Sequence, residues 1–367
     1  MELTRRGVVG GVAAAAAGLA AEGVRAEPAF PAGAVIRSLL KDHPPGELAG
    51  GATLFHEHMS IRDGFMEEWF RHAAETRNAA RLPGSSSPLA RPAASPTANV
   101  LRDEALMTEE MRVARREGVA CIVDAGHPDM GRDISFLRRI SRSSGLPIVA
   151  SAGFYAQPFY PEALSRWSED RVVQEIMKQV LADDIGALGE IGSWDDITAD
   201  ERKVFRAVGR VHRATNLPIF THTGIPGKSA LEQLNILEDQ GVDPRRVCIG
   251  HLGNLSDPKT EIQRAVLRRG AYVGFDRQGG AGDDPVVAMA MSLIAAGYEE
   301  QLLFSSDIAS SRELKRFNPD GGGYAKTVTV FAPKLKRAGA DDNVVQKILH
   351  DNLRRFLAFA PHIRRNR

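Results

Sequence analysis

The sequence predicts a single (β/α)8 TIM barrel, an α/β fold in which helices surround eight parallel strands. Eight short, almost continuously apolar runs follow one another along the chain, as expected for parallel strands buried on both faces. The segments between them have the periodicity of amphipathic helices, and a strand–helix unit repeated eight times is typical of this barrel. The 367 residues suffice for one such domain, so no second domain is needed.

The expected elements alternate regularly after residue 50. Glycine or proline marks several junctions, including Gly118, Gly145 and Pro218, because these residues end helices and strands. The predicted strands are 53–60, 119–126, 147–154, 187–193, 218–224, 247–253, 271–276 and 302–308. The predicted helices are 104–116, 134–144, 171–181, 199–214, 230–240, 259–268 and 285–296.

The first 26 residues predict a cleaved twin-arginine export signal. Arg5 and Arg6 precede a weakly hydrophobic, Ala- and Gly-rich stretch that is too short to span a bilayer. A small-residue cleavage site ends at Ala26. A disordered Ala-rich leader with chance arginines is the alternative. We therefore expect a mature domain of residues 27–367 in the periplasm or outside the cell, without a stable membrane anchor.

Residues 82–97 form a Pro-, Ser- and Ala-rich insert after the first predicted strand. We expect a flexible loop there. Because barrel active sites lie among the loops at the carboxyl ends of the strands, this loop could act as a lid. A featureless surface loop is an equal alternative.

Charge and cysteine content exclude two classes of protein. The formal net charge is +1, so the chain shows no electrostatic sign of nucleic-acid binding. The two cysteines, Cys121 and Cys248, lie inside apolar runs and predict buried thiols, not a disulfide framework. The expected partner is a small-molecule substrate. The sequence leaves the oligomeric state open, with a homodimer as one candidate.

Side chains that can bind metal end five of the predicted strands. Alternate residues of a strand point the same way, so His56 and His58 should face the barrel interior together while Glu57 turns away. The other ligand candidates end strands four, five, six and eight: Glu190, His222, His251 and Asp307. Nitrogen and carboxylate ligands suit zinc, and manganese, cobalt or nickel also fit. Surface or core roles are expected for the other histidines, which are His43, His72, His127, His212, His350 and His362.

The pattern predicts two ions. Glu190 lies between glycines that allow close backbone approach, and each of its carboxylate oxygens can reach one ion. Closure of the barrel would bring Asp307 to the histidine pair of the first strand, while His222 and His251 would hold the second ion. Paired ions about 3.5–4 Å apart hold a shared water and lower its pKa toward neutrality. Asp307 is then placed as the catalytic residue that accepts the proton of this water.

The motifs resemble the phosphotriesterase family of the amidohydrolase superfamily, over about residues 50–357. They occur in family order and at family-like spacing, which makes the resemblance specific. They include Gly51-Ala-Thr-Leu-Phe-His-Glu-His58, Ile122-Val-Asp-Ala-Gly126, Gly131-Arg-Asp133, Ser151-Ala-Gly-Phe-Tyr155, Val247-Cys-Ile-Gly-His251, Gly274-Phe-Asp-Arg277, Ser305-Ser-Asp307, Asn318-Pro-Asp-Gly321 and Ile348-Leu-His-Asp-Asn-Leu-Arg-Arg-Phe-Leu357.

The resemblance implies a binuclear metallohydrolase with the bridging ligand at the end of strand four. The best-known members have a carboxylated lysine there, whereas this chain has Glu190, as other members do. The glutamate keeps the bridging charge and argues against true organophosphate turnover. The resemblance assigns the buried ion to His56, His58 and Asp307, and the exposed ion to His222 and His251. Tyr155 and Arg277 are the candidate substrate-binding residues, with a structural wall role as an equal alternative for each.

Hydrolysis of an ester, lactone or phosphoester by a metal-bridging hydroxide is the leading hypothesis. The first alternative is a metal-dependent deoxyribonuclease of the same superfamily, which also has a Gly-Glu-Ile-Gly strand. The neutral net charge and the segment from Gly250 to Asn254 argue against it. The second alternative is an exported metal-binding barrel without catalysis. Retention of Asp307, which is more a proton acceptor than a structural ligand, argues against that role.

Overall fold

A computed structural model describes residues 27–79, 100–224, 227, 229–255, 257, 259–280 and 282–363. The predicted export signal and the predicted loop at 82–97 lie outside these residues, and both stay predictions. Within the described ranges, none of the helices has the length and apolar character that a membrane span requires.

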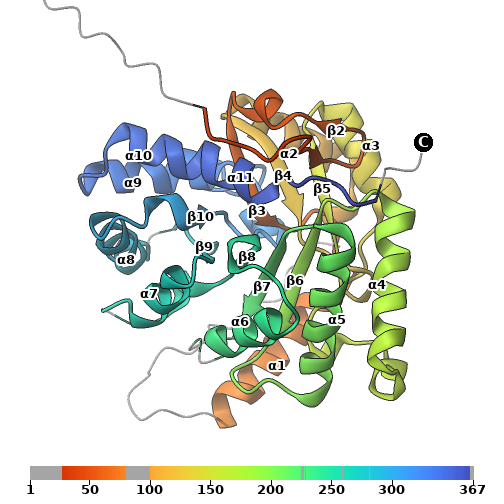
Figure 1. Cartoon of the computed structure of the whole chain (residues 1–367). Coiled ribbons are helices and arrows are strands. Elements are labelled where there is room, and N and C mark those ends of the chain that lie inside the picture. Colours follow the sequence, from red (N-terminus) through yellow and green to blue (C-terminus); the bar gives the residue numbers. More distant parts are fainter. Residues whose placement is uncertain are drawn as a thin grey trace, which may run out of the picture.

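Eight parallel strands form the predicted barrel, with helices around them (Figure 1). Strands that follow one another in the chain are neighbours in the sheet, from β3 to β10. Almost all strand residues are buried, which explains their continuous apolar runs. The strands are β3 (Ala52–Glu57), β4 (Val119–Asp124), β5 (Ile148–Ala152), β6 (Ala187–Ser193), β7 (Ile219–Thr223), β8 (Val247–Ile249), β9 (Tyr272–Phe275) and β10 (Leu302–Phe304).

The helices between the strands begin within two residues of their predicted starts. Side chains of Asp103, Asp133 and Thr198 accept backbone N–H groups at the starts of three of them, which satisfies donors that have no partner inside the helix. These helices are α2 (Glu104–Arg116), α3 (Ile134–Ser144), α4 (Glu169–Asp183), α5 (Ala199–Thr215), α6 (Ala230–Asp239), α7 (Glu261–Arg268) and α8 (Asp284–Ala295).

Several elements were not predicted. A two-stranded hairpin precedes the barrel, formed by β1 (Ile36–Arg37) and β2 (Asp42–His43). The helix α1 (Phe65–Ala79) follows β3. After β10 come the π-helical turn Thr327–Phe331 with α9 (Ala332–Arg337), and then α10 (Asp342–Gln346), the π-helical turn Lys347–Asn352 and α11 (Leu353–Leu357). The chain thus adds one helix near the carboxyl end of β3 and a helical segment after the last strand.

The barrel closes where the first barrel strand meets the last. The backbone N–H of Asp307 donates to the carbonyl of His56, and the N–H of His58 donates to the carbonyl of Ile308, each at 3.0 Å. Two predicted ligands of the first strand are thereby fixed beside the predicted ligand of the eighth strand.

Glu57 points away from the centre of the barrel, as predicted, and ties the two strands together. Its buried carboxylate accepts the hydroxyl of Ser305 and the N–H of Ser306, both at 2.7 Å, and the N–H of Ile308 at 3.0 Å. The side chain that faces away from the predicted ligands therefore closes the barrel.

We expect Glu57→Ala to lower the free energy of unfolding by about 3 kcal/mol, because each buried donor left without a partner costs about 1–3 kcal/mol. Denaturant titration measures the change. Glu104→Ala is the matched control, since Glu104 forms a half-exposed ion pair with Arg139, a type of pair that contributes only about 0–1 kcal/mol. Equal losses in the two variants would contradict the role of Glu57.

Candidate metal centre

The six predicted ligands meet at the carboxyl ends of the barrel strands. Their potential ligand atoms form three overlapping groups, and within each group these atoms lie within 4.8 Å of one another. Five of the six residues are almost completely buried, and the side chain of Asp307 is 11% exposed. The groups are His56, His58 and Glu190; Glu190, His222 and His251; and His56, His251 and Asp307.

Glu190 lies between two pairs of histidines. Its Oε2 atom is 3.1 Å from Nε2 of His56 and 3.5 Å from Nε2 of His58. Its Oε1 atom is 2.5 Å from Nδ1 of His222 and 3.2 Å from Nε2 of His251. Each carboxylate oxygen therefore faces one histidine pair, which is the arrangement expected of a carboxylate shared by two ions.

The glycines around Glu190 allow β6 to approach its neighbours. A Cβ atom at Gly189 would lie 2.4 Å from the carbonyl oxygen of Phe220, and Gly189 has a φ of 143°. A Cβ atom at Gly192 would lie 2.6 Å from the carbonyl oxygen of Tyr155. Only glycine fits such contacts, so the expectation of close backbone approach is confirmed.

Asp307 and His251 lie just beyond the ends of β10 and β8, where longer strands were predicted. Both have left-handed backbone conformations, with φ of 49° and 61°. Residues other than glycine adopt this region infrequently, and such residues concentrate at functional sites. The turns direct Oδ1 of Asp307 to 3.1 Å from Nε2 of His58 and 3.6 Å from Nε2 of His56.

Asp276 supports the centre from behind and was not among the predicted site residues. It accepts Nδ1–H of His251 at 2.7 Å and Nδ1–H of His56 at 3.0 Å. In the neutral form of each ring these bonds place the proton on Nδ1, and Nε2 is the nitrogen that faces Glu190. Asp276 directly follows β9. A carboxylate at a strand end is the sequence signal that could have identified it as a site residue. Burial raises its pKa, but the charges and hydrogen bonds of the two histidines lower it further, and the net shift is downward.

Histidines and carboxylates lie within about 4 Å of one another in the centre, so each shifts the pKa of its neighbours. Burial alone lowers the pKa of His58, yet hydrogen bonds to Asp307 and Glu190 raise it to about 9. Burial alone raises the pKa of Glu190, yet the charges of His56 and His222 hold it well below its usual range. Nε2 of His56, which faces Oε2 of Glu190, is buried without a hydrogen-bond partner. Imidazole nitrogens that face ionised carboxylates are a ligand set that fits divalent ions, which would take the place of the protons between them.

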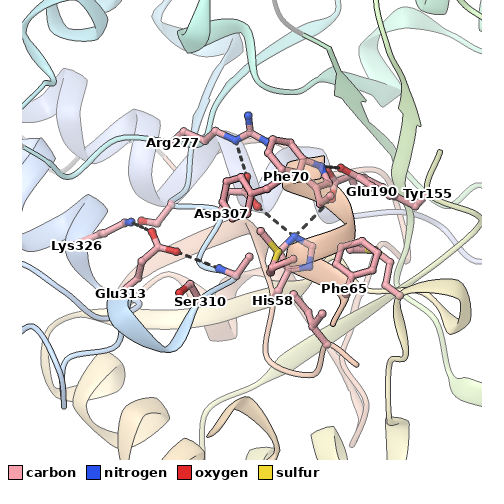
Figure 2. Close-up of a pocket in the computed structure, with 16 residues that line it drawn as sticks. His58, Phe65, Phe70, Tyr155, Glu190, Arg277, Asp307, Ser310, Glu313 and Lys326 are labelled. Carbon is pink, nitrogen blue, oxygen red and sulfur yellow. Dashed lines mark hydrogen bonds and ion pairs between the residues drawn. The ribbon is translucent and has the colours of Figure 1, made fainter. Parts of the chain in front are cut away.

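Tyr155 and Arg277 both lie at the centre (Figure 2), and both contact Trp69, which was not predicted. Nε1–H of Trp69 donates to the hydroxyl of Tyr155 at 2.7 Å, and this hydroxyl is 3.0 Å from Nδ1 of His222. Nε–H of Arg277 donates to Oδ2 of Asp307 at 2.7 Å, and its guanidinium lies 5.6 Å from the ring centroid of Trp69. Trp69 therefore contacts both predicted substrate-binding residues.

A cavity of about 270 Å³ opens above the predicted ligands (Figure 2). One wall is largely apolar and comes mainly from α1. The opposite wall carries Ser310 and the ion pair of Glu313 and Lys326, whose charged atoms are 2.9 Å apart. The apolar wall consists of Ile61, Phe65, Met66, Trp69, Phe70 and Met130.

The other histidines stay outside the ligand set. His43, in the hairpin, contacts Ser38 and Glu47, and His212 in α5 donates to the carbonyl of Leu217 just after that helix. The ring of His72 makes an edge-to-face contact with Trp194, at a centroid distance of 4.8 Å. His127 is buried and contacts the strand that carries Glu190. This last contact gives His127 a closer relation to the centre than the expected core role.

Comparisons to known proteins agree with the fold. A model of the phosphotriesterase family matches residues 45–357. The chain belongs to this family. A phosphotriesterase homology protein from Escherichia coli strain K12 is 32% identical over 263 residues, which cover 69% of this chain and 88% of the relative.

Two further relatives and one solved structure of phosphotriesterase-type proteins have names that state an activity. An N-acetyltaurine hydrolase from Tetraodon nigroviridis is 28% identical over 279 residues, covering 71% of this chain and 79% of the relative. An aryldialkylphosphatase from Saccharolobus solfataricus is 26% identical over 328 residues, which cover 84% of this chain and 95% of the relative. A crystal structure of a lactonase from Listeria monocytogenes aligns with a TM-score of 0.73 and 25% identity, and the alignment covers 88% of this chain and 98% of the lactonase.

These comparisons confirm the predicted family and barrel. They also support a hydrolase, because the named members are hydrolases of the phosphotriesterase family. Members of the family are metal-dependent, which agrees with the cluster of histidines and carboxylates. The individual roles of the six ligands, Tyr155 and Arg277 stay predictions.

Proposed function

We propose that this chain is a binuclear metal-dependent hydrolase that cleaves an ester, lactone or phosphoester bond, with zinc as the expected metal. The position of the two carboxylate oxygens of Glu190 is the main support for this proposal. One oxygen faces His56 and His58, and the other faces His222 and His251. A centre for one ion would need only three or four of these side chains, whereas two ions use all four histidines and both oxygens of the carboxylate.

Two bound divalent ions would supply a water of lowered pKa and a Lewis acid for the substrate oxygen. Asp307 is the proposed acceptor of the proton from the attacking water. Burial raises the pKa of Asp307, but the charges of Arg277 and His56 hold it well below its usual range, so the carboxylate is ionised. The ion pair with Arg277 also fixes the orientation of the carboxylate.

Tyr155 is proposed to donate a hydrogen bond to the substrate. Burial and the nearby charge of Glu190 raise the pKa of Tyr155 well above its usual value, so the phenol keeps its proton. Its oxygen accepts N–H from Trp69 and lies 3.0 Å from Nδ1 of His222. An ion held by His222 would occupy the lone pair of that ring, and the hydroxyl proton could then be donated to an oxygen of the substrate. The apolar wall of α1 would hold the alkyl or aryl part of the substrate.

Metal removal and a substrate panel test the proposal. The zinc-loaded protein is assayed on lactones, carboxyl esters, phosphodiesters and phosphotriesters. An N-acyl amide is included because an N-acetyltaurine hydrolase is among the relatives, and DNA is included for the nuclease alternative. We expect hydrolysis of an ester, lactone or phosphoester. We also expect a chelator to abolish it and added zinc to restore it.

Elemental analysis accompanies each assay, so that activity can be related to the number of bound ions. Full activity in protein shown to be free of metal would contradict the proposal. Preferred hydrolysis of DNA would favour the nuclease. Absence of hydrolysis across the panel by protein with two bound ions would favour a metal-binding barrel without catalysis.

A further inference from the structure

His127 lies in the turn after β4 and is completely buried. Its Nε2 atom is 2.6 Å from the carbonyl oxygen of Gly189. The carbonyl of Ala125, two residues earlier in the same turn, accepts the N–H of Glu190 at 3.4 Å. Both polar groups of the peptide unit that joins Gly189 to Glu190 therefore bind one short segment, residues 125–127.

This contact is not part of the pairing of the barrel strands. In the sheet, β5 lies between β4 and β6, so His127 reaches across one strand to contact β6. Gly153 lies just after β5, beside this contact. A Cβ atom there would lie only 2.3 Å from Cδ1 of Ile191, and at an ordinary contact distance of 3.5 Å from Nε2 of His127. The contact thus requires a local arrangement that strand pairing alone does not produce.

The protonation state of His127 follows from its partner. A carbonyl oxygen only accepts, so the proton of the ring is on Nε2. Burial lowers the pKa of His127 to about 3, which keeps the ring neutral and Nδ1 bare. Nδ1 is 3.7 Å from Oδ1 of Asp129, whose other oxygen accepts the N–H of Tyr155 at 2.8 Å. The same turn therefore lies against the backbone of both Glu190 and Tyr155.

We propose that His127 is a positioning residue that sets the bridging carboxylate of Glu190 by holding the peptide unit before it. The inference rests on the proposed binuclear centre. Glu190 must present one oxygen to each histidine pair, so a displacement of its backbone disturbs both ends of the carboxylate. Hydrogen-bond partners behind metal ligands typically change metal affinity or activity by about 10–100-fold when they are removed.

The test compares three substitutions in the full-length protein loaded with cobalt, by cobalt affinity and by the visible absorption spectrum of the bound ions. His127→Leu keeps the bulk and removes the donor. We expect it to weaken cobalt binding by about 10–100-fold and to change the spectrum. His127→Gln can still donate to the carbonyl of Gly189, and we expect it to recover most of the affinity. His127→Asn has an amide too short to reach that oxygen, so it should resemble the leucine variant and can replace it if that variant does not fold.

His212→Leu is the matched control. His212 is buried and its Nδ1–H donates to the carbonyl of Leu217 at 2.7 Å, a bond of the same type outside the cluster of ligands. We expect this variant to lower the melting temperature while the cobalt affinity and spectrum stay unchanged. It separates the loss of a buried histidine from an effect on the centre.

Three outcomes would contradict the role of His127 or the centre on which it rests. Unchanged cobalt affinity and spectrum in His127→Leu or His127→Asn, with two ions in the unmodified protein, would overturn the inference and leave the proposed function standing. Equal losses in the glutamine and leucine variants would overturn it as well. Failure of the unmodified protein to bind two ions would refute the binuclear centre itself, and the inference with it.

Discussion

Asp307→Asn is expected to lower kcat by about 10²–10⁴-fold, the usual contribution of a general base, while the protein remains folded. Asparagine matches the shape of aspartate, but its amide cannot accept the proton of the attacking water. Contacts with His58 and Arg277 place the carboxylate of Asp307 in the centre of the site. Its lowered pKa keeps it ionised and able to accept a proton. Steady-state kinetics on the best substrate of the panel, with metal content and melting temperature, measure the effect.

Asp243→Asn is the control for this variant. Asp243 forms a partly exposed ion pair with Arg245 and is not among the ligands, so we expect its kinetics to stay within about twofold, as for surface substitutions generally. Near-normal turnover by the Asp307 variant would remove that residue from the mechanism. A loss of rate that follows only from loss of bound metal would make Asp307 a ligand and not the base.

Glu190→Gln is expected to reduce binding from two ions to one or none and to abolish turnover. The amide carries no charge and has a single oxygen, so it cannot serve His56 and His58 on one side and His222 and His251 on the other. The histidine pairs would then lack the anion that lies between them. Elemental analysis after dialysis counts the ions, and calorimetry gives the affinity of each.

Glu201→Gln is the matched control for Glu190. Glu201 is equally buried, but its carboxylate accepts the N–H of Thr198 in the capping box of α5. Glutamine can accept the same bond, so we expect two ions and normal turnover. Two tightly bound ions in the Glu190 variant would show that the carboxylate does not bridge, and the centre would need a different description.

The barrel and the positions of the candidate ligands could be predicted because both depend on local sequence. Each apolar run is a strand buried on both faces, and the carboxyl ends of parallel strands lie at one end of a barrel. A ligand-type side chain at a strand end is therefore placed by the strand itself. Glu190, His222, His251 and Asp307 all followed from this rule, although β8 and β10 are shorter than predicted.

The supporting residues could not be predicted in the same way, because their roles depend on packing between distant segments. Asp276 binds histidines from two other strands, and His127 contacts a strand that is not its neighbour. Trp69 belongs to α1, a helix whose large apolar side chains line the cavity as well as the core. The sequence of α1 therefore lacks a clear amphipathic pattern, and nothing in it distinguished this helix from the insert that follows.

The candidate metal ligands lie on both sides of the junction between the first and last strands of the barrel. His58 and Asp307 are separated by 249 positions in the chain and meet only when β10 docks beside β3. During synthesis, the first two histidines emerge long before the aspartate that completes their surroundings. The proposed pocket for the ion held by His56, His58 and Asp307 would therefore be complete only after ring closure, once translation has passed Asp307.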